Sequence, residues 1–168
     1  MALLWRRPAL PDDVGSRLTL APGDRVLAHA ELRDGWAVVS RHALHVARGA
    51  SMWSRPWSEV DGAALDPQTS RLTVRWVGDR AAEVLELADD RDVALPRALH
   101  ERVQSSVVHL ENVTLPNGAA VRVVLRRGAG NELLTQVLGT DAVDLSDPET
   151  ARLVDDAEAR VRGAAGLR

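Results

Sequence analysis

The chain has 168 residues and a net charge of −3, and 45% of its residues are hydrophobic, which suits one globular domain with an appendage. It contains no cysteine, which excludes disulfides, thiol nucleophiles and thiolate zinc sites. No apolar run approaches the about 20 residues that a membrane-spanning helix needs, and the opening apolar stretch is too short for a signal peptide. We therefore expect a cytoplasmic protein without a membrane span.

The composition is biased in a way that reflects codon usage. All 21 basic residues are Arg, and Lys, Ile, Phe and Tyr are absent. Because these four amino acids have AT-rich codons, we infer a GC-rich bacterial genome, such as that of an actinobacterium. The core must then be built from Val, Leu, Ala and the five Trp, with Val supplying the β-branched shape that strands prefer.

Residues 1–24 have the composition of an N-terminal arm. Their prolines favour an extended start, and one or two helical turns are expected near Asp12–Leu18. The segment RPALP has the Pro-x-x-Pro spacing that SH3-like grooves accept, although packing of the arm on its own barrel is the simpler interpretation. Trp5 and Arg7 are candidate partner-binding residues in this arm.

From residue 25 the hydrophobic period becomes two. Turn signals such as Asp34-Gly35 separate seven short segments, at 25–32, 36–40, 43–48, 52–57, 60–66, 71–77 and 81–88. Their number and close spacing predict a seven-stranded β-barrel or sandwich.

The period then changes to 3.6. One apolar stripe recurs at spacings of four, four, four and three, and consists of Leu95, Leu99, Val103, Val107 and Leu110. This stripe predicts a helix over 95–110 that closes the barrel, and the fold class is therefore α+β.

The remaining residues predict a β-hairpin over 119–139 and a final helix that Ser146 or Asp147 caps. The expected organisation is an arm at 1–24, the barrel with its capping helix at 25–110, and an appendage at 111–168 packed on the barrel. Because a lone hairpin needs cover, the 119–139 hairpin is a candidate for homo-oligomer formation.

Two segments carry a resemblance to a known family. VVSRHAL (38–44) and RPWSEVDGA (55–63) resemble characteristic segments of bacterial pleckstrin-homology-like or GRAM-like domains, although Ala43 departs from the Arg that the family often has. The resemblance covers 25–110 and implies a barrel plugged by one helix, used as a binding or assembly scaffold. The WRRP start and the ERVQSSVV segment are also similar to actinobacterial proteins of about this length, and they imply no specific activity.

Metal and catalytic sites are not expected. His42 and His45 lie three residues apart, so on a strand their side chains point to opposite faces, and we expect no metal or cofactor. The chain has no Gly-x-Ser-x-Gly motif, and Ser51, Ser54 and Ser58 fall in expected turn or strand-edge positions. We therefore assign no catalytic residue and expect that the protein is not an enzyme.

We expect a non-catalytic module that binds protein. Tryptophans are expected to fill the barrel or to stack at its open end, and a cluster exposed at that end would be a binding patch. Trp53 and Trp57 are therefore candidate partner-binding residues. Two alternatives remain open: a small-molecule binder or enzyme with a pocket at the barrel mouth, and a nucleic-acid-associated regulator acting through Arg122, Arg126 and Arg127. The slightly acidic charge argues against a phosphoinositide partner, and the lack of a basic excess argues against nucleic acid.

Overall fold

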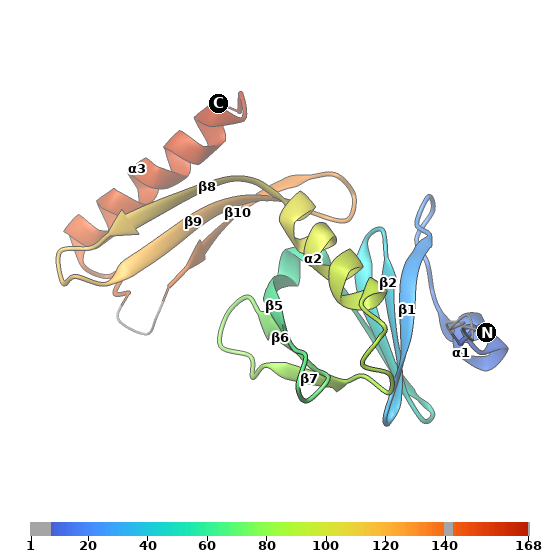
Figure 1. Cartoon of the computed structure of the whole chain (residues 1–168). Coiled ribbons are helices and arrows are strands. Elements are labelled where there is room, and N and C mark those ends of the chain that lie inside the picture. The colour runs from blue at the N-terminus through green and yellow to red at the C-terminus, as the bar shows by residue number, and fades with distance from the viewer. Residues whose placement is uncertain (1–7, 140–142, 168) are drawn as a thin grey trace. The chain divides into compact units, whose positions relative to one another are not determined.

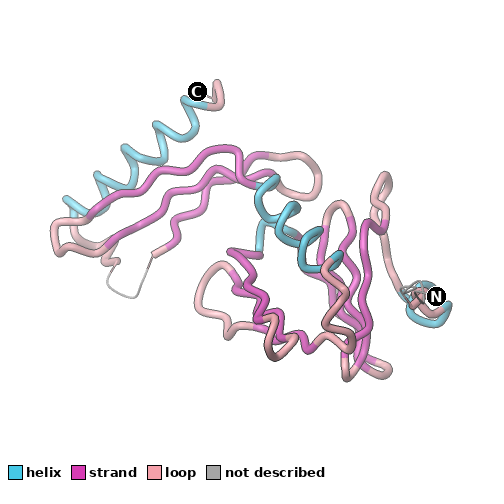
Figure 2. The backbone as a smooth tube through the Cα atoms, viewed as in Figure 1, coloured by secondary structure: helices cyan, strands magenta, loops and turns pink. Residues whose placement is uncertain are grey.

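The computed structural model describes residues 8–139 and 143–167, and its fold is α+β with antiparallel strands (Figure 1). The strands of the described residues form three sheets, one of four strands and two of three (Figure 2). The chain divides into two compact units, residues 1–103 and residues 104–168. The α+β class expected from the sequence is confirmed.

The first unit contains the strands that the period-two pattern predicts. One antiparallel sheet has the order β1-β2-β3-β4, with β1 (Val26–Leu32), β2 (Gly35–Ser40), β3 (Ala43–Arg48) and β4 (Ser51–Pro56). A short 3-10 helix, η1 (Trp57–Glu59), leads to a second sheet with the order β5-β6-β7, made of β5 (Val60–Asp66), β6 (Arg71–Trp76) and β7 (Glu83–Glu86). Alternation of apolar and polar side chains gives each sheet one face to bury.

The two sheets of the first unit are joined at one corner. Leu32, at the end of β1, forms an antiparallel bridge with Leu87, just after β7, and the Arg33 N–H donates to the Glu86 carbonyl at 2.9 Å. Within the described residues no bridge joins β4 to β5, so the expected closed seven-stranded barrel is not confirmed. Pro56 ends β4 without an N–H, and η1 then turns the chain away from further pairing.

One apolar cluster fills the space between these two sheets. Its helical part comes from α2 (Ala94–Ser106), which lies across one end of that space (Figure 1) and contributes Leu95, Leu99 and Val103. The strands contribute small and branched side chains from both sheets, among them Ala30, Ala37, Val39, Leu44, Val46, Val60, Leu72, Val74 and Leu85.

The helix ends earlier than its apolar stripe predicts. α2 stops at Ser106 and the chain continues directly as β8 (Val107–Thr114), so the expected helix over 95–110 is wrong in its last turn. Val107 and Leu110 lie on this strand, and Leu110 is 39% exposed. Residues 107–114 include three valines and also suit a strand, and pairing with a neighbouring strand overrides the local helical spacing.

The second unit contains the predicted hairpin and final helix, with β8 as an additional strand. Its sheet has the order β10-β9-β8, with β9 (Ala120–Arg127) and β10 (Leu133–Leu138). α3 (Pro148–Ala164) packs on this sheet (Figure 1), and the Asp147 carboxylate accepts a hydrogen bond from the Thr150 N–H at 2.8 Å, which confirms one of the two predicted caps. The buried cluster joins the sheet to the helix through Val113, Val121, Val123, Leu125, Val154, Ala157 and Val161.

The described part of the arm is tied to the first sheet. It contains α1 (Asp12–Arg17), which confirms the short helix expected there. The Arg17 guanidinium donates to the Gly49 carbonyl at 2.8 Å, and a ring nitrogen of His29 lies 3.1 Å from the Pro8 carbonyl oxygen. None of the helices in the described parts of the chain is long and apolar enough to cross a membrane.

Two leucines test where α2 ends. Leu99 is fully buried in the cluster between the sheets, so Leu99→Ala is expected to lower the free energy of unfolding by about 2–5 kcal/mol. Leu110 is half-exposed on β8, so Leu110→Ala is expected to cost less than about 1 kcal/mol. Urea unfolding followed by circular dichroism measures both changes, and equal losses would instead place both leucines on one buried helical stripe.

Candidate functional site

The side of the first unit where β4 and β5 are not joined to each other carries a cluster of large side chains. We call this cluster the open corner. It consists of Trp53 on β4, Arg55 on β4, Glu59 on η1, Trp76 on β6 and Arg80 after β6.

Two tryptophans form the apolar part of the open corner. The Trp53 ring packs edge-on against the Trp76 ring, with a centroid separation of 5.6 Å and an interplanar angle of 73°. Trp76 is buried in the core cluster, whereas Trp53 is half-buried and packs against that cluster from its rim. The open corner therefore presents part of one indole ring that the fold already holds in place.

Three linked charged side chains reach one of these rings. The Arg80 guanidinium lies over the Trp76 ring at 5.7 Å from its centroid, and its NH1 atom donates to a Glu59 carboxylate oxygen at 3.3 Å. The Nε atom of Arg55 lies 3.8 Å from the same carboxylate oxygen. Because ion pairs at this degree of exposure contribute little to stability, their main effect is to arrange two cations around one carboxylate.

Trp57 is not part of this surface. Its side chain is buried, and its indole N–H donates to the Ser40 carbonyl oxygen at 3.1 Å. The prediction that Trp57 contacts a partner is therefore wrong. A buried indole takes an acceptor for its N–H, and the turn at η1 places this ring where such an acceptor lies.

A chain of polar side chains lies on the outer face of the first sheet. The Nδ1 atom of His45 is 2.6 Å from the Ser54 hydroxyl oxygen, and its Nε2 atom is 3.0 Å from the Ser40 hydroxyl oxygen. The Ser40 hydroxyl donates to the Asp24 carboxylate at 2.8 Å. We call Asp24, Ser40, His45 and Ser54 the serine–histidine chain.

His45 is the buried member that joins the two serines. Burial lowers the pKa of His45 from its ordinary value of 6.5, and the negative charge of Asp24 opposes that shift without reversing it. The imidazole is therefore neutral at neutral pH and can accept a proton. No group of three or more metal-ligating side chains occurs in the described ranges 8–139 and 143–167, and His45 instead uses both ring nitrogens in the serine–histidine chain.

The three arginines of the hairpin do not form one exposed patch. Arg122 and Arg127 are exposed, but only 2% of Arg126 is accessible, so Arg126 is not part of an exposed basic patch. Arg127 follows Arg126 directly on β9 and so points to the opposite face of the sheet, where it donates to the Asn131 side chain at 2.8 Å. The sequence showed the alternation but not which face of β9 would be buried at this position.

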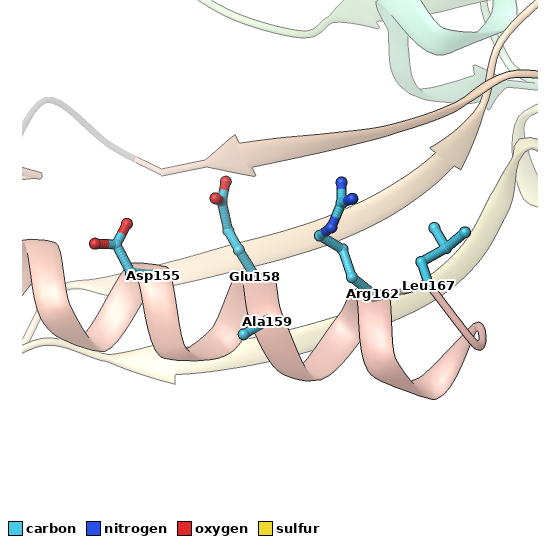
Figure 3. Close-up of a pocket in the computed structure, with 5 residues that line it drawn as sticks. All are labelled: Asp155, Glu158, Ala159, Arg162 and Leu167. Carbon is cyan, nitrogen blue, oxygen red and sulfur yellow. The ribbon is translucent and has the colours of Figure 1, made fainter.

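The remaining predicted contact residues and the depression on α3 do not extend either of these two clusters. Trp5 and Arg7 lie outside the described residues. A shallow, open depression on α3 is lined by Asp155, Glu158, Ala159, Arg162 and Leu167 (Figure 3). Its charged side chains project from one side of the helix and have the spacing of an ordinary solvated helix face.

The sequence contained a signal for the serine–histidine chain that our prediction did not use. The turn after Arg48 pairs Arg48 with Ser51, and counting outward from that pair sets His45 opposite Ser54. The contacts of His45 with Ser40 and of Ser40 with Asp24 join separate segments, so no spacing rule predicts them.

No family model, curated protein or solved structure matches the chain.

The buried His45 predicts that the first unit loses stability in mild acid. Its pKa in the folded chain lies below the unfolded value, so the unfolded chain binds a proton first as the pH falls below about 6.5. The stability is complete above the unfolded pKa and is lost as the pH falls toward the folded pKa. Urea titrations across this range, followed by Trp fluorescence, are expected to show this loss in the wild type and a smaller loss in His45→Asn. The same pH dependence of the free energy of unfolding in both proteins would contradict the assignment to His45.

Proposed function

We propose that the first unit is a pleckstrin-homology-like module whose role is the non-catalytic binding of protein. The support is its topology: a four-stranded sheet followed by a three-stranded sheet, a bridge between the first and last of these strands, and a helix directly after them that enters the core. This order of elements agrees with the one that the segments at 38–44 and 55–63 imply. The proposal thus rests on a sequence resemblance together with seven strands that one helix follows.

The observation that carries the binding proposal is the open corner. Binding energy at protein interfaces concentrates in a few side chains, with Trp, Tyr and Arg enriched among them. Trp53 is half-buried against Trp76, so little side-chain entropy is lost when a partner covers its exposed part. Arg80 lies over Trp76, the ring on which Trp53 packs, and Arg55 pairs with the same carboxylate as Arg80.

The open corner also suggests the chemistry of the partner segment. β4 and β5 each form the end of their sheet, so an extended segment can add its backbone hydrogen bonds to either outer edge. Arg55 and Arg80 share the single carboxylate of Glu59, so these three side chains together carry one positive charge. An extended segment with an apolar side chain next to a carboxylate complements both features.

The alternatives have less support. A small-molecule pocket at the barrel mouth would have to open into the space between the two sheets, which apolar side chains including Leu44, Val60 and Leu85 already fill. The burial of Arg126 argues against a nucleic-acid site on the hairpin, and so do the opposite directions in which Arg126 and Arg127 point. Both alternatives stay secondary to protein binding at the open corner.

Trp53 provides the direct test of this proposal. Affinity capture with the purified chain, followed by mass spectrometry of co-eluting proteins and metabolites, is expected to recover a partner protein. The captured amount of this protein should fall about tenfold or more with Trp53→Ala, a change typical of a central interface residue. Trp36→Ala is the matched control, because the Trp36 ring lies 6.1 Å from the His29 ring, centroid to centroid, and is not part of the open corner. Circular dichroism verifies that both variants are folded. Recovery of a metabolite without a protein, or equal capture by both variants, would overturn the proposal.

We also propose self-association through β8, which revises the expected role of the 119–139 hairpin. β8 is an end strand of its sheet and leaves Val108 and Leu110 more than a third exposed. An antiparallel pair of β8 strands centred on Leu110 sets the Leu110 side chains of the two copies opposite each other, so the pairing covers apolar surface that one chain leaves exposed.

Light scattering after size-exclusion chromatography tests this pairing. The wild type is expected to shift from one chain mass toward twice that mass as its concentration rises. Leu110→Lys should stay at one chain mass, because it sets two like charges opposite each other at the centre of the pair. A mass that does not change with concentration, or a dimer that survives Leu110→Lys, would contradict pairing through β8.

A further inference from the structure

The hydrogen bonds of the serine–histidine chain all run in one direction. The Ser40 hydroxyl has one proton and gives it to the Asp24 carboxylate at 2.8 Å rather than to the more distant Ala43 carbonyl at 3.2 Å. The Ser40 oxygen then accepts from His45, so the His45 proton lies on Nε2. The lone pair on Nδ1 is left to accept the Ser54 hydroxyl proton across 2.6 Å.

This direction is the one that general-base activation of a serine requires. A weak nucleophile becomes reactive when a neutral imidazole is ready to take its proton and a third group fixes the tautomer of that imidazole. His45 lies where such a base would, and its hydrogen bond to Ser40, which in turn donates to Asp24, holds the ring in place. Asp24 is itself fixed, because it also accepts from the backbone N–H of Arg25 at 2.8 Å.

Ser54 is accessible while its base is not. Ser54 is exposed on the end strand β4, whereas only 2% of His45 is accessible. An electrophile can therefore approach Ser54 from solvent, and water has little access to the imidazole that would take up the proton.

The register of β4 also places a backbone donor beside this hydroxyl. The Trp57 N–H donates to the His42 carbonyl, and hydrogen-bonded pairs alternate along an antiparallel ladder, so the pair Ser54 and His45 is a non-hydrogen-bonded one. Side chains approach most closely at such pairs, and the Ser54 N–H points to the outer edge of the sheet. This N–H can stabilise negative charge that develops on an electrophile bound to Ser54.

We propose that Ser54 is an activated nucleophile that accepts an acyl or phosphonyl group from an activated donor, with His45 as its general base. The Ser54 oxygen forms a bond to the carbonyl carbon of an activated ester, its proton passes to Nδ1 of His45, and the bond to the leaving alcohol breaks. His45 then returns this proton to the oxygen of the leaving alcohol. With a single backbone donor beside the oxygen, the step is expected to be stoichiometric rather than a rapid turnover.

This inference is independent of the proposed protein binding at the open corner. Trp53 and Ser54 are neighbours on β4 and therefore point to opposite faces of the sheet. Loss of capture by Trp53→Ala and loss of reactivity by Ser54→Ala thus report on different surfaces.

A fluorophosphonate probe tests the nucleophile in the full chain. Intact mass spectrometry is expected to show one phosphonyl group added per chain, and peptide mapping to place it on Ser54. Ser54→Ala should abolish labelling, and His45→Asn should slow it by about 100-fold or more, the contribution typical of a general base. Ser51→Ala, on the same strand, should label like the wild type.

Ser40 acts as a positioning residue, and its role is separable from folding. Ser40→Ala is expected to slow labelling by about tenfold, and Ser40→Thr, which keeps the hydroxyl, should restore most of the rate. Labelling of Ser54 no faster than that of Ser51, or an unchanged rate in folded His45→Asn, would overturn the proposal.

A thiol at the same position gives a second measurement that leaves His45 intact. Because the chain has no cysteine, Ser54→Cys introduces a single thiol, which the adjacent imidazole should convert to thiolate. Alkylation of Ser54→Cys by iodoacetamide at neutral pH is expected to be about tenfold or more faster than alkylation of Ser51→Cys. Equal rates would contradict activation by His45.

Discussion

The first unit depends on one constraint, which is that two sheets must bury their apolar faces against each other around a core that lacks Phe, Tyr and Ile. Small and branched side chains make up most of this core, together with Trp57 and Trp76. The two sheets meet at the bridge between Leu32 and Leu87, and α2 fills one end with three apolar side chains. Because the apolar area is buried from several directions at once, no single strand of this unit would be stable alone.

Both proposed sites follow from the parts of this arrangement that the core does not use. At the open corner, the sheets separate after Pro56, and Trp53 covers the rim of the core without being fully buried. On the outer face, His45 is buried away from the core cluster and must satisfy both ring nitrogens with nearby hydroxyl groups. The first site offers apolar surface and charge to a partner, whereas the second offers a polarised hydroxyl group.

Much of the first unit was predictable because its strands repeat one local rule. Alternation with a period of two located the segments from residue 25 to residue 88, and turn residues separated them. The same kind of local pattern failed at Val107 and Leu110, where helical spacing and strand-forming residues coincide and only pairing with β9 decides between them. It also failed at Arg126, because alternation gives two faces and does not state which residue of the polar face is covered.

The sequence by itself determined the α+β class, the strands of the first unit, the hairpin and the start of α3 near its two candidate caps, because each depends on neighbours along the chain. Only the tertiary structure decided that Trp57 is buried, that the sheets stay open between β4 and β5, and that Asp24, Ser40, His45 and Ser54 form one chain of hydrogen bonds. The physical reason is that burial and side-chain contact depend on which segments meet in space. Hydrophobic attraction is non-directional and drives the apolar segments together. The polar side chains that become buried must then find hydrogen-bond partners inside the fold.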